Sequence, residues 1–133
     1  MRYPIYLHKD PDSAYGVTVP DISGCFSAGD TMEEAILNAT EAIECHIEGL
    51  LIDGEDYPIP QPMEYHSQNP DLTDGFWGIV TVDLTKLSGK SKRINITIPE
   101  RLLSKIDAQA ASLGENRSSF LLAAALEQIN KSA

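Results

Sequence analysis

Residues 93–99 of the chain read Arg-Ile-Asn-Ile-Thr-Ile-Pro, a strict alternation of isoleucine with polar side chains. Successive side chains of a β-strand point to opposite faces, so the pattern predicts a strand with one face made of isoleucine. That inner face would consist of Ile94, Ile96 and Ile98. The outer face would consist of Arg93, Asn95 and Thr97. Pro99 cannot continue a strand ladder but suits the first turn of a helix, so a helix is expected to follow at once.

Two helices are predicted after this strand, one on each side of Gly114. Apolar residues recur there at helical spacing, first Leu102, Leu103, Ile106, Ala110 and Leu113, then Phe120, Leu121, Ala124, Ala125 and Ile129. Asn116 or Ser118 can cap the second helix. A single strand-helix-helix unit of this size cannot bury all these side chains, and a lone strand has two unpaired edges. A two-fold dimer, in which the strands pair antiparallel, would solve both problems.

The charge of the chain is divided unequally between its two parts. Acidic residues outnumber basic ones 20 to 10, for a formal net charge of −10. Residues 1–85 contain two basic and sixteen acidic residues, whereas residues 86–133 contain eight basic and four acidic ones. We therefore predict a domain over residues 1–85 with charge −14, a linker over 86–91 and a second domain over 92–133, and the linker and second domain together carry +4.

The N-terminal part shows strand periodicity followed by one long helix. Alternating apolar residues predict strands near residues 3–7 and 15–19, and a third is expected over 25–28. Thr31 with Glu34, or Asp30 with Glu33, has capping-box spacing, and the helix that either pair begins should end at Gly54. Residues 55–75 are rich in proline and predict a loop. Residues 76–84 are apolar on both faces, which predicts a strand inside a covered sheet.

The sequence offers little support for catalysis or for a cofactor. Asp10, Asp12 and Asp21 could supply carboxylates to a metal-dependent nuclease, but each lies beside a proline, where turn formation explains it more simply. Cys45 and His46 are adjacent on the predicted helix and would point in different directions, so they are poorly placed to bind one ion. We expect a non-enzyme without cofactor or metal. We also expect a cytoplasmic protein with no membrane partner, because apolar runs are short and no secretory signal is present.

The C-terminal part resembles the ribbon-helix-helix DNA-binding family. The resemblance rests on residues 93–99 and on Gly114-Glu-Asn-Arg-Ser-Ser-Phe120. It implies that two chains form a ribbon that enters the major groove of operator DNA. Base-reading residues would be Arg93, Asn95 and Thr97, whose side chains suit guanine, adenine and thymine respectively. Phosphate-binding residues would be Asn116, Arg117 and Ser118 at a helix start. Ile94, Ile96 and Ile98 would form the dimer core.

Residues 14–62 resemble the HicB antitoxin family. The marks are Tyr15-Gly-Val, Val19-Pro-Asp-Ile, the run from Gly24 to Thr31 (Gly-Cys-Phe-Ser-Ala-Gly-Asp-Thr), and Ile59-Pro-Gln-Pro. The resemblance implies an α+β protein: a partial ribonuclease-H-like β-β-β-α-β domain followed by a β-α-α ribbon-helix-helix dimerisation domain.

The same resemblance implies a function in two parts. The N-terminal domain would bind and neutralise an mRNA-cleaving HicA-type toxin, and the homodimer or a higher oligomer would repress its own operon. Charge supports the first part, because a protein that cuts RNA should be basic and residues 1–85 are strongly acidic. The alternative is a ribbon-helix-helix regulator whose N-terminal domain senses a small ligand.

Overall fold

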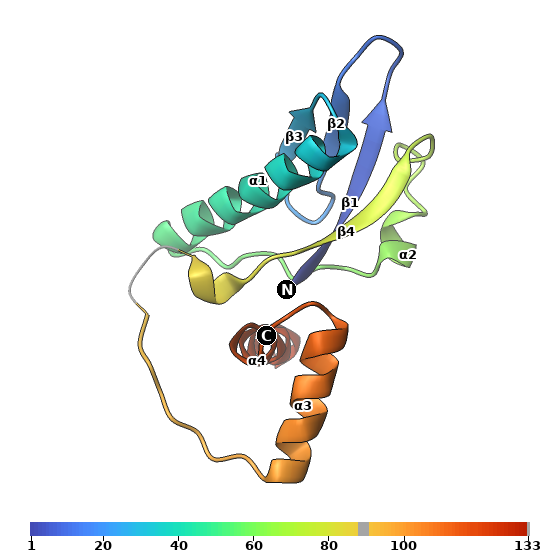
Figure 1. Cartoon of the computed structure of the whole chain (residues 1–133). Coiled ribbons are helices and arrows are strands. Elements are labelled where there is room, and N and C mark those ends of the chain that lie inside the picture. The colour runs from blue at the N-terminus through green and yellow to red at the C-terminus, as the bar shows by residue number, and fades with distance from the viewer. Residues whose placement is uncertain (88–90, 133) are drawn as a thin grey trace. The chain divides into compact units, whose positions relative to one another are not determined.

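The structure is a computed structural model that describes residues 1–87 and 91–132 and divides the chain into two compact units (Figure 1). The N-terminal unit comprises Arg2–Val82. The C-terminal unit comprises Met1 and the residues from Asp83 onward. The centre of the predicted linker, residues 88–90, lies outside the described residues.

An antiparallel four-stranded sheet forms the frame of the N-terminal unit. Its strands are β1 (Arg2–Lys9), β2 (Tyr15–Thr18), β3 (Phe26–Gly29) and β4 (Phe76–Thr81), in the order β3-β2-β1-β4. The three strands predicted near the N-terminus are confirmed, and they follow one another as a meander. The alternating side chains Tyr3, Ile5 and Leu7 of β1 are almost fully buried as the periodicity predicted, but Pro4 and Tyr6 on the other face are buried as well, so the strand is not half-buried.

The long helix α1 (Met32–Ile52) covers one face of this sheet (Figure 1). Of the two predicted capping pairs the structure has Thr31 with Glu34, since the Thr31 hydroxyl accepts a hydrogen bond from the Glu34 amide at 3.1 Å. The buried stripe of the helix consists of Ala35, Ala39, Ile43 and Ile47. Gly29 allows close approach to the helix, because a Cβ there would lie 2.5 Å from the Ala35 nitrogen.

Strand β4 departs from its prediction in length and in position. It ends at Thr81 and lies at an edge of the sheet, with Phe76 67% and Ile79 43% exposed, so it is not a strand inside a covered sheet. The apolar pattern misled because Val82 and Leu84 are buried beyond the strand end, Leu84 in the 3-10 turn η1 (Leu84–Lys86). Alternation shows which side chains are buried, but not which element buries them.

The proline-rich loop contains a short helix that the sequence did not predict. This helix, α2 (Met63–His66), places His66 against Trp77, with 6.3 Å between the ring centroids. His66 Nε2 is also 2.9 Å from Asp21 Oδ1, and both side chains are buried. The loop is thereby attached to the turn between β2 and β3.

Two helices, both predicted, follow in the C-terminal unit: α3 (Glu100–Ser112) and α4 (Arg117–Ser132). Between them Gly114 adopts a φ of +70°, which favours glycine. Large apolar side chains stay exposed in this unit, among them Leu102 at 51% and Ile129 at 65%. Among the described residues, no helix has the length and hydropathy that crossing a membrane requires.

Candidate nucleic-acid interface

The segment that should form the ribbon is not a strand in the single chain. Residues 91–99 are without regular secondary structure, so the predicted strand of the β-α-α unit is absent here. The physical reason is that a strand needs a hydrogen-bonding neighbour, and no strand among residues 1–87 and 91–132 pairs with this segment. Ile94 is 71% and Ile96 61% exposed, whereas Ile98 is half-buried. Their role as a dimer core therefore stays a prediction about two chains.

The three residues predicted to read bases lie in the same segment. Arg93, Asn95 and Thr97 are all exposed. Exposure leaves them accessible to DNA, but their presentation on one face depends on the strand forming. Their role therefore also stays a prediction.

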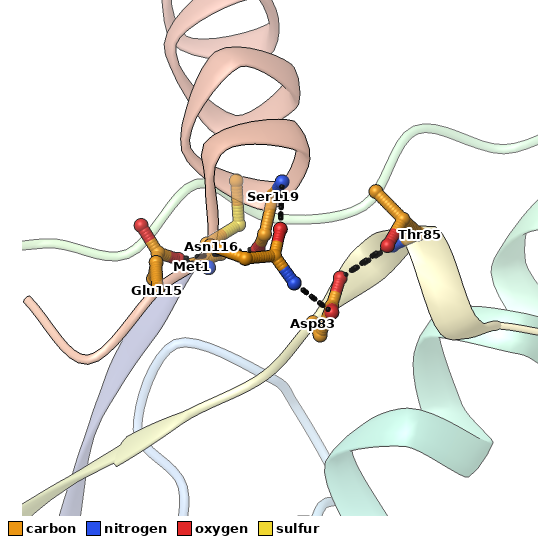
Figure 2. Close-up of polar contacts among 6 residues, drawn as sticks. All are labelled: Met1, Asp83, Thr85, Glu115, Asn116 and Ser119. Carbon is orange, nitrogen blue, oxygen red and sulfur yellow. Dashed lines mark hydrogen bonds and ion pairs between the residues drawn. The ribbon is translucent and has the colours of Figure 1, made fainter. Parts of the chain in front are cut away.

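The first predicted phosphate-binding residue, Asn116, is bonded at both ends of its side-chain amide (Figure 2). Its oxygen accepts a hydrogen bond from the Ser119 amide at 2.8 Å, which caps α4. Its nitrogen donates to Asp83 Oδ2 at 2.9 Å. The capping bond therefore orients the amide so that its donor faces a carboxylate.

The Asp83 carboxylate is itself held by the turn that it begins. Asp83 Oδ1 accepts hydrogen bonds from the Thr85 amide at 3.0 Å and from the Thr85 hydroxyl at 2.6 Å (Figure 2). Partial burial raises the pKa of the Asp83 carboxyl, but the bonds donated by Thr85 and Asn116 outweigh it, and the pKa lies below its usual value. Asp83 is therefore ionised at neutral pH.

The second predicted phosphate-binding residue, Arg117, forms a two-pronged ion pair with Asp107 of α3. The guanidinium Nε and Nη2 donate to the two carboxylate oxygens at 2.9 and 2.8 Å. These hydrogen bonds lower the pKa of Asp107 and raise that of Arg117. Both side chains are exposed to solvent, where such a pair contributes little to stability.

The third predicted residue, Ser118, is exposed, but the next serine is buried. Ser119 is 1% exposed, and its hydroxyl lies 3.5 Å from Glu115 Oε1. The Met1 amino group contacts the same glutamate oxygen (Figure 2). Three acidic side chains thus contact residues at the start of α4. Asp83 contacts Asn116, Asp107 contacts Arg117, and Glu115 contacts Ser119.

These acidic partners, Asp83, Asp107 and Glu115, were missed by reasoning from the sequence. The spacing of Asp83 and Thr85 is a recognisable local turn signal and could have been found. The pairing of Asp107 with Arg117 crosses a helix-helix turn, and that of Asp83 with Asn116 spans 33 positions. Neither leaves a local pattern in the sequence.

The carboxylates considered for catalysis do not converge. Asp10 and Asp12 are exposed in the β1–β2 turn, whereas Asp21 is buried and bonded to His66 and to the Gln61 amide. In residues 1–87 and 91–132, no three His, Cys, Asp or Glu side chains are grouped as a metal site requires.

Comparison with known proteins identifies the family of the chain. A family model described as the HicB-like antitoxin of bacterial toxin-antitoxin systems matches residues 3–125. A 14.9 kDa protein of Haemophilus phage HP1, from the rep-hol intergenic region, is 51% identical over 91% of this chain and 92% of its own length. The antitoxin HicB of Escherichia coli K12 is 33% identical over 50% of this chain and 48% of its own length.

Solved structures agree with the sequence matches. The Burkholderia pseudomallei antitoxin HicB is similar over 96% of this chain and 98% of its own, with 47% identity and a TM-score of 0.75. The antitoxin HicB3 is similar over 97% of this chain and 98% of its own, with 36% identity and a TM-score of 0.63. A structure described as the HicA3 and HicB3 toxin-antitoxin complex contains a chain similar over 62% of this one and 99% of its own, with 36% identity and a TM-score of 0.55. This chain therefore belongs to the HicB-like antitoxin family of bacterial toxin-antitoxin systems.

Proposed function

We propose that the chain neutralises a HicA-type, RNA-cleaving toxin through its N-terminal unit and represses its own operon through its C-terminal unit. The observation that carries the first part is the HicA3–HicB3 complex, whose matching chain covers 62% of this one. That share is close to the fraction of the chain that the N-terminal unit Arg2–Val82 makes up, 81 of 133 residues. A chain of that length is present with a toxin, which supports placing the toxin-binding surface on the N-terminal unit.

Charge and fold give further support. Fifteen of the twenty acidic residues lie in Arg2–Val82, which contains only two basic ones. A basic RNA-cleaving partner would be attracted to such a surface and would associate faster at low salt. The order β-β-β-α-β is that of a partial ribonuclease H fold, and we propose this relationship as well.

Toxin binding is tested by co-expressing the full chain with the protein encoded by the neighbouring reading frame, which the proposal predicts to be short and basic. We expect the two to co-purify, and the RNA cleavage of the neighbour to fall to background when the chain is added in stoichiometric amount. A matched reaction with an unrelated acidic protein controls for charge alone. If the neighbour does not bind, or cleaves RNA equally well when bound, the antitoxin part of the proposal is wrong.

The second part of the proposal rests on the exposed isoleucines of residues 93–98. Two large apolar side chains that alternate with Arg, Asn and Thr, those of Ile94 and Ile96, are exposed to water in a single chain. Antiparallel pairing of this segment with a second copy would bury them and would present the polar face to the major groove as a ribbon-helix-helix dimer. The partner of that face would be the operator of the chain's own operon.

Operator binding is tested with a labelled duplex that carries the DNA upstream of the gene. We expect a dimer or a larger oligomer to bind it at least 10³-fold more tightly than a mixed-sequence duplex, as specific repressors do. Equal affinity for both duplexes would contradict operator recognition.

A further inference from the structure

Two residues that the ribbon-helix-helix resemblance assigns to DNA phosphate are already bonded to carboxylates of the same chain. The Asn116 amide donates to Asp83, and the Arg117 guanidinium donates to Asp107. The carboxylates come from two different elements, the turn η1 and the helix α3, and they meet their partners at the start of α4. Both bonds lie within the C-terminal unit.

A carboxylate and a phosphate diester compete for the same donors. Each is a singly charged oxygen acceptor that favours guanidinium groups, amides and helix N-termini. Asp83 occupies one N–H group of the Asn116 amide, and Asp107 occupies the Nε and one Nη2 hydrogen of Arg117. A phosphate that approaches these same N–H groups must displace the carboxylate, and one that uses the remaining N–H groups meets the carboxylate's negative charge. We propose that Asp83 and Asp107 are internal competitors of DNA phosphate, which occupy Asn116 and Arg117 in the DNA-free protein and lower its affinity for all DNA. This inference rests on the proposed DNA binding of the C-terminal unit.

Asp83 is well suited to this role because its carboxylate is positioned in advance. One oxygen is fixed by the two bonds from Thr85, which leaves the other for Asn116. Asn116 is equally constrained, since its own oxygen caps α4 through Ser119. The pair therefore forms without ordering a flexible side chain, which reduces the entropic cost of the contact.

The Asp107–Arg117 pair adds a competitor of a different kind. The pair is exposed and contributes little to stability, so a phosphate can replace the Asp107 carboxylate at a small cost in free energy. The competition still acts on every DNA equally, because phosphate contacts are independent of sequence. Base contacts are unaffected, so the two carboxylates would suppress non-specific binding while leaving sequence preference intact.

Neutralising substitutions in the full chain test the competition. Asp83→Asn keeps an oxygen for Thr85, and Asp107→Asn keeps the side-chain shape of α3. The control Asp71→Asn removes the same charge from an exposed position in the loop before β4. The probes are the upstream duplex and a mixed-sequence duplex of equal length. We expect Asp83→Asn and Asp107→Asn each to raise affinity for both duplexes about two- to fivefold, as a charge near a helix terminus would, and Asp71→Asn to change it less.

Double-mutant cycles separate competition from general charge effects. Asn116→Ser keeps a capping hydroxyl but removes the donor to Asp83, so in that background Asp83→Asn should have no effect. Asp107→Asn should likewise have none in an Arg117→Ala background. Equal gains with and without the partner residue, or an equal gain from Asp71→Asn, would overturn the proposal.

The outcomes also separate this inference from the proposed function. If the wild-type chain binds the upstream duplex and both Asn variants bind it equally well, only the competition is refuted. If the wild-type chain and both variants bind neither duplex, operator binding itself is refuted and the competition with it. Circular dichroism of each variant shows whether the comparison is between folded proteins.

Discussion

Asp21 attaches two other segments of the N-terminal unit through one buried carboxylate oxygen. Asp21 Oδ1 lies 2.9 Å from the Gln61 amide nitrogen and 2.9 Å from His66 Nε2, and its side chain is 3% exposed. The sequence marks Asp21 as a turn residue beside Pro20, but its main partner lies 45 positions away. No local pattern could reveal that contact, so the role of Asp21 could not be predicted.

Removing this carboxylate should be costly. Asp21→Ala leaves the buried His66 imidazole without its acceptor and also removes the acceptor of the exposed Gln61 amide, and we expect the unfolding free energy to fall by about 1–3 kcal/mol. Urea unfolding followed by Trp77 fluorescence measures the change. The control Asp71→Ala, at an exposed site, should stay within about 0.5 kcal/mol of the wild type. Equal stability of the two variants would show that Asp21 does not attach the loop.

The two cysteines should differ sharply in reactivity. Cys25 is buried and Cys45 is exposed. Burial, with a smaller effect from the nearby Cys45, raises the pKa of the Cys25 thiol, so its reactive thiolate is scarce as well as inaccessible. We expect one thiol per chain to react with Ellman's reagent in the native protein and the second only after unfolding. In Cys45→Ser the native reaction should disappear, and rapid labelling of that variant would contradict the placement of Cys25.

At the scale of elements, periodicity predicted what each segment would form on its own. The three N-terminal strands, α1, α3 and α4 were predicted because their apolar patterns are local, and the caps at Thr31 and Gly114 mark their ends. The edge position of β4 and the helix α2 were not, because they depend on pairing and packing between distant segments. The strand predicted over residues 93–98 is the special case, since its partner would be another molecule.

A polar substitution on the isoleucine face tests that strand. Ile96→Asp would place a carboxylate in the centre of the paired ribbon, where it has no partner. We expect the dissociation constant of the dimer to rise at least 100-fold. Light scattering coupled to size-exclusion chromatography gives the mass. Thr97→Asp introduces the same group on the opposite face and should stay dimeric. A dimeric Ile96→Asp variant would mean that oligomers form elsewhere.

Arg93 and Arg117 should affect DNA binding in different ways, because one would contact bases and the other phosphates. We expect Arg93→Ala to reduce the free energy of binding to the upstream duplex by about 1–3 kcal/mol and to relax sequence preference. Arg117→Ala should weaken binding to both duplexes similarly. It should also reduce the slope of log affinity against log salt concentration by about one. Fluorescence anisotropy across a salt series distinguishes the two. Unchanged operator binding by Arg93→Ala would refute the ribbon assignment.

At the scale of the whole molecule, a net charge of −10 argues against DNA binding only if it is treated as uniform. The division into −14 for residues 1–85 and +4 for residues 86–133 assigns opposite signs to the proposed toxin-binding and DNA-binding parts. In a dimer the basic parts together would carry +8, and the acidic parts would repel phosphate at long range. Non-specific DNA binding should therefore be weakened by charges that never contact DNA.

Deleting Arg2–Val82 separates this long-range repulsion from the short-range competition, because Asp83 and Asp107 are retained. We expect the truncated chain to bind a mixed-sequence duplex more tightly than the full chain at low salt. The difference should shrink between 50 and 300 mM salt, because screening acts over about 10 Å at 0.1 M and over less at higher salt. An affinity difference that is independent of salt would point to steric occlusion, and no difference would refute repulsion.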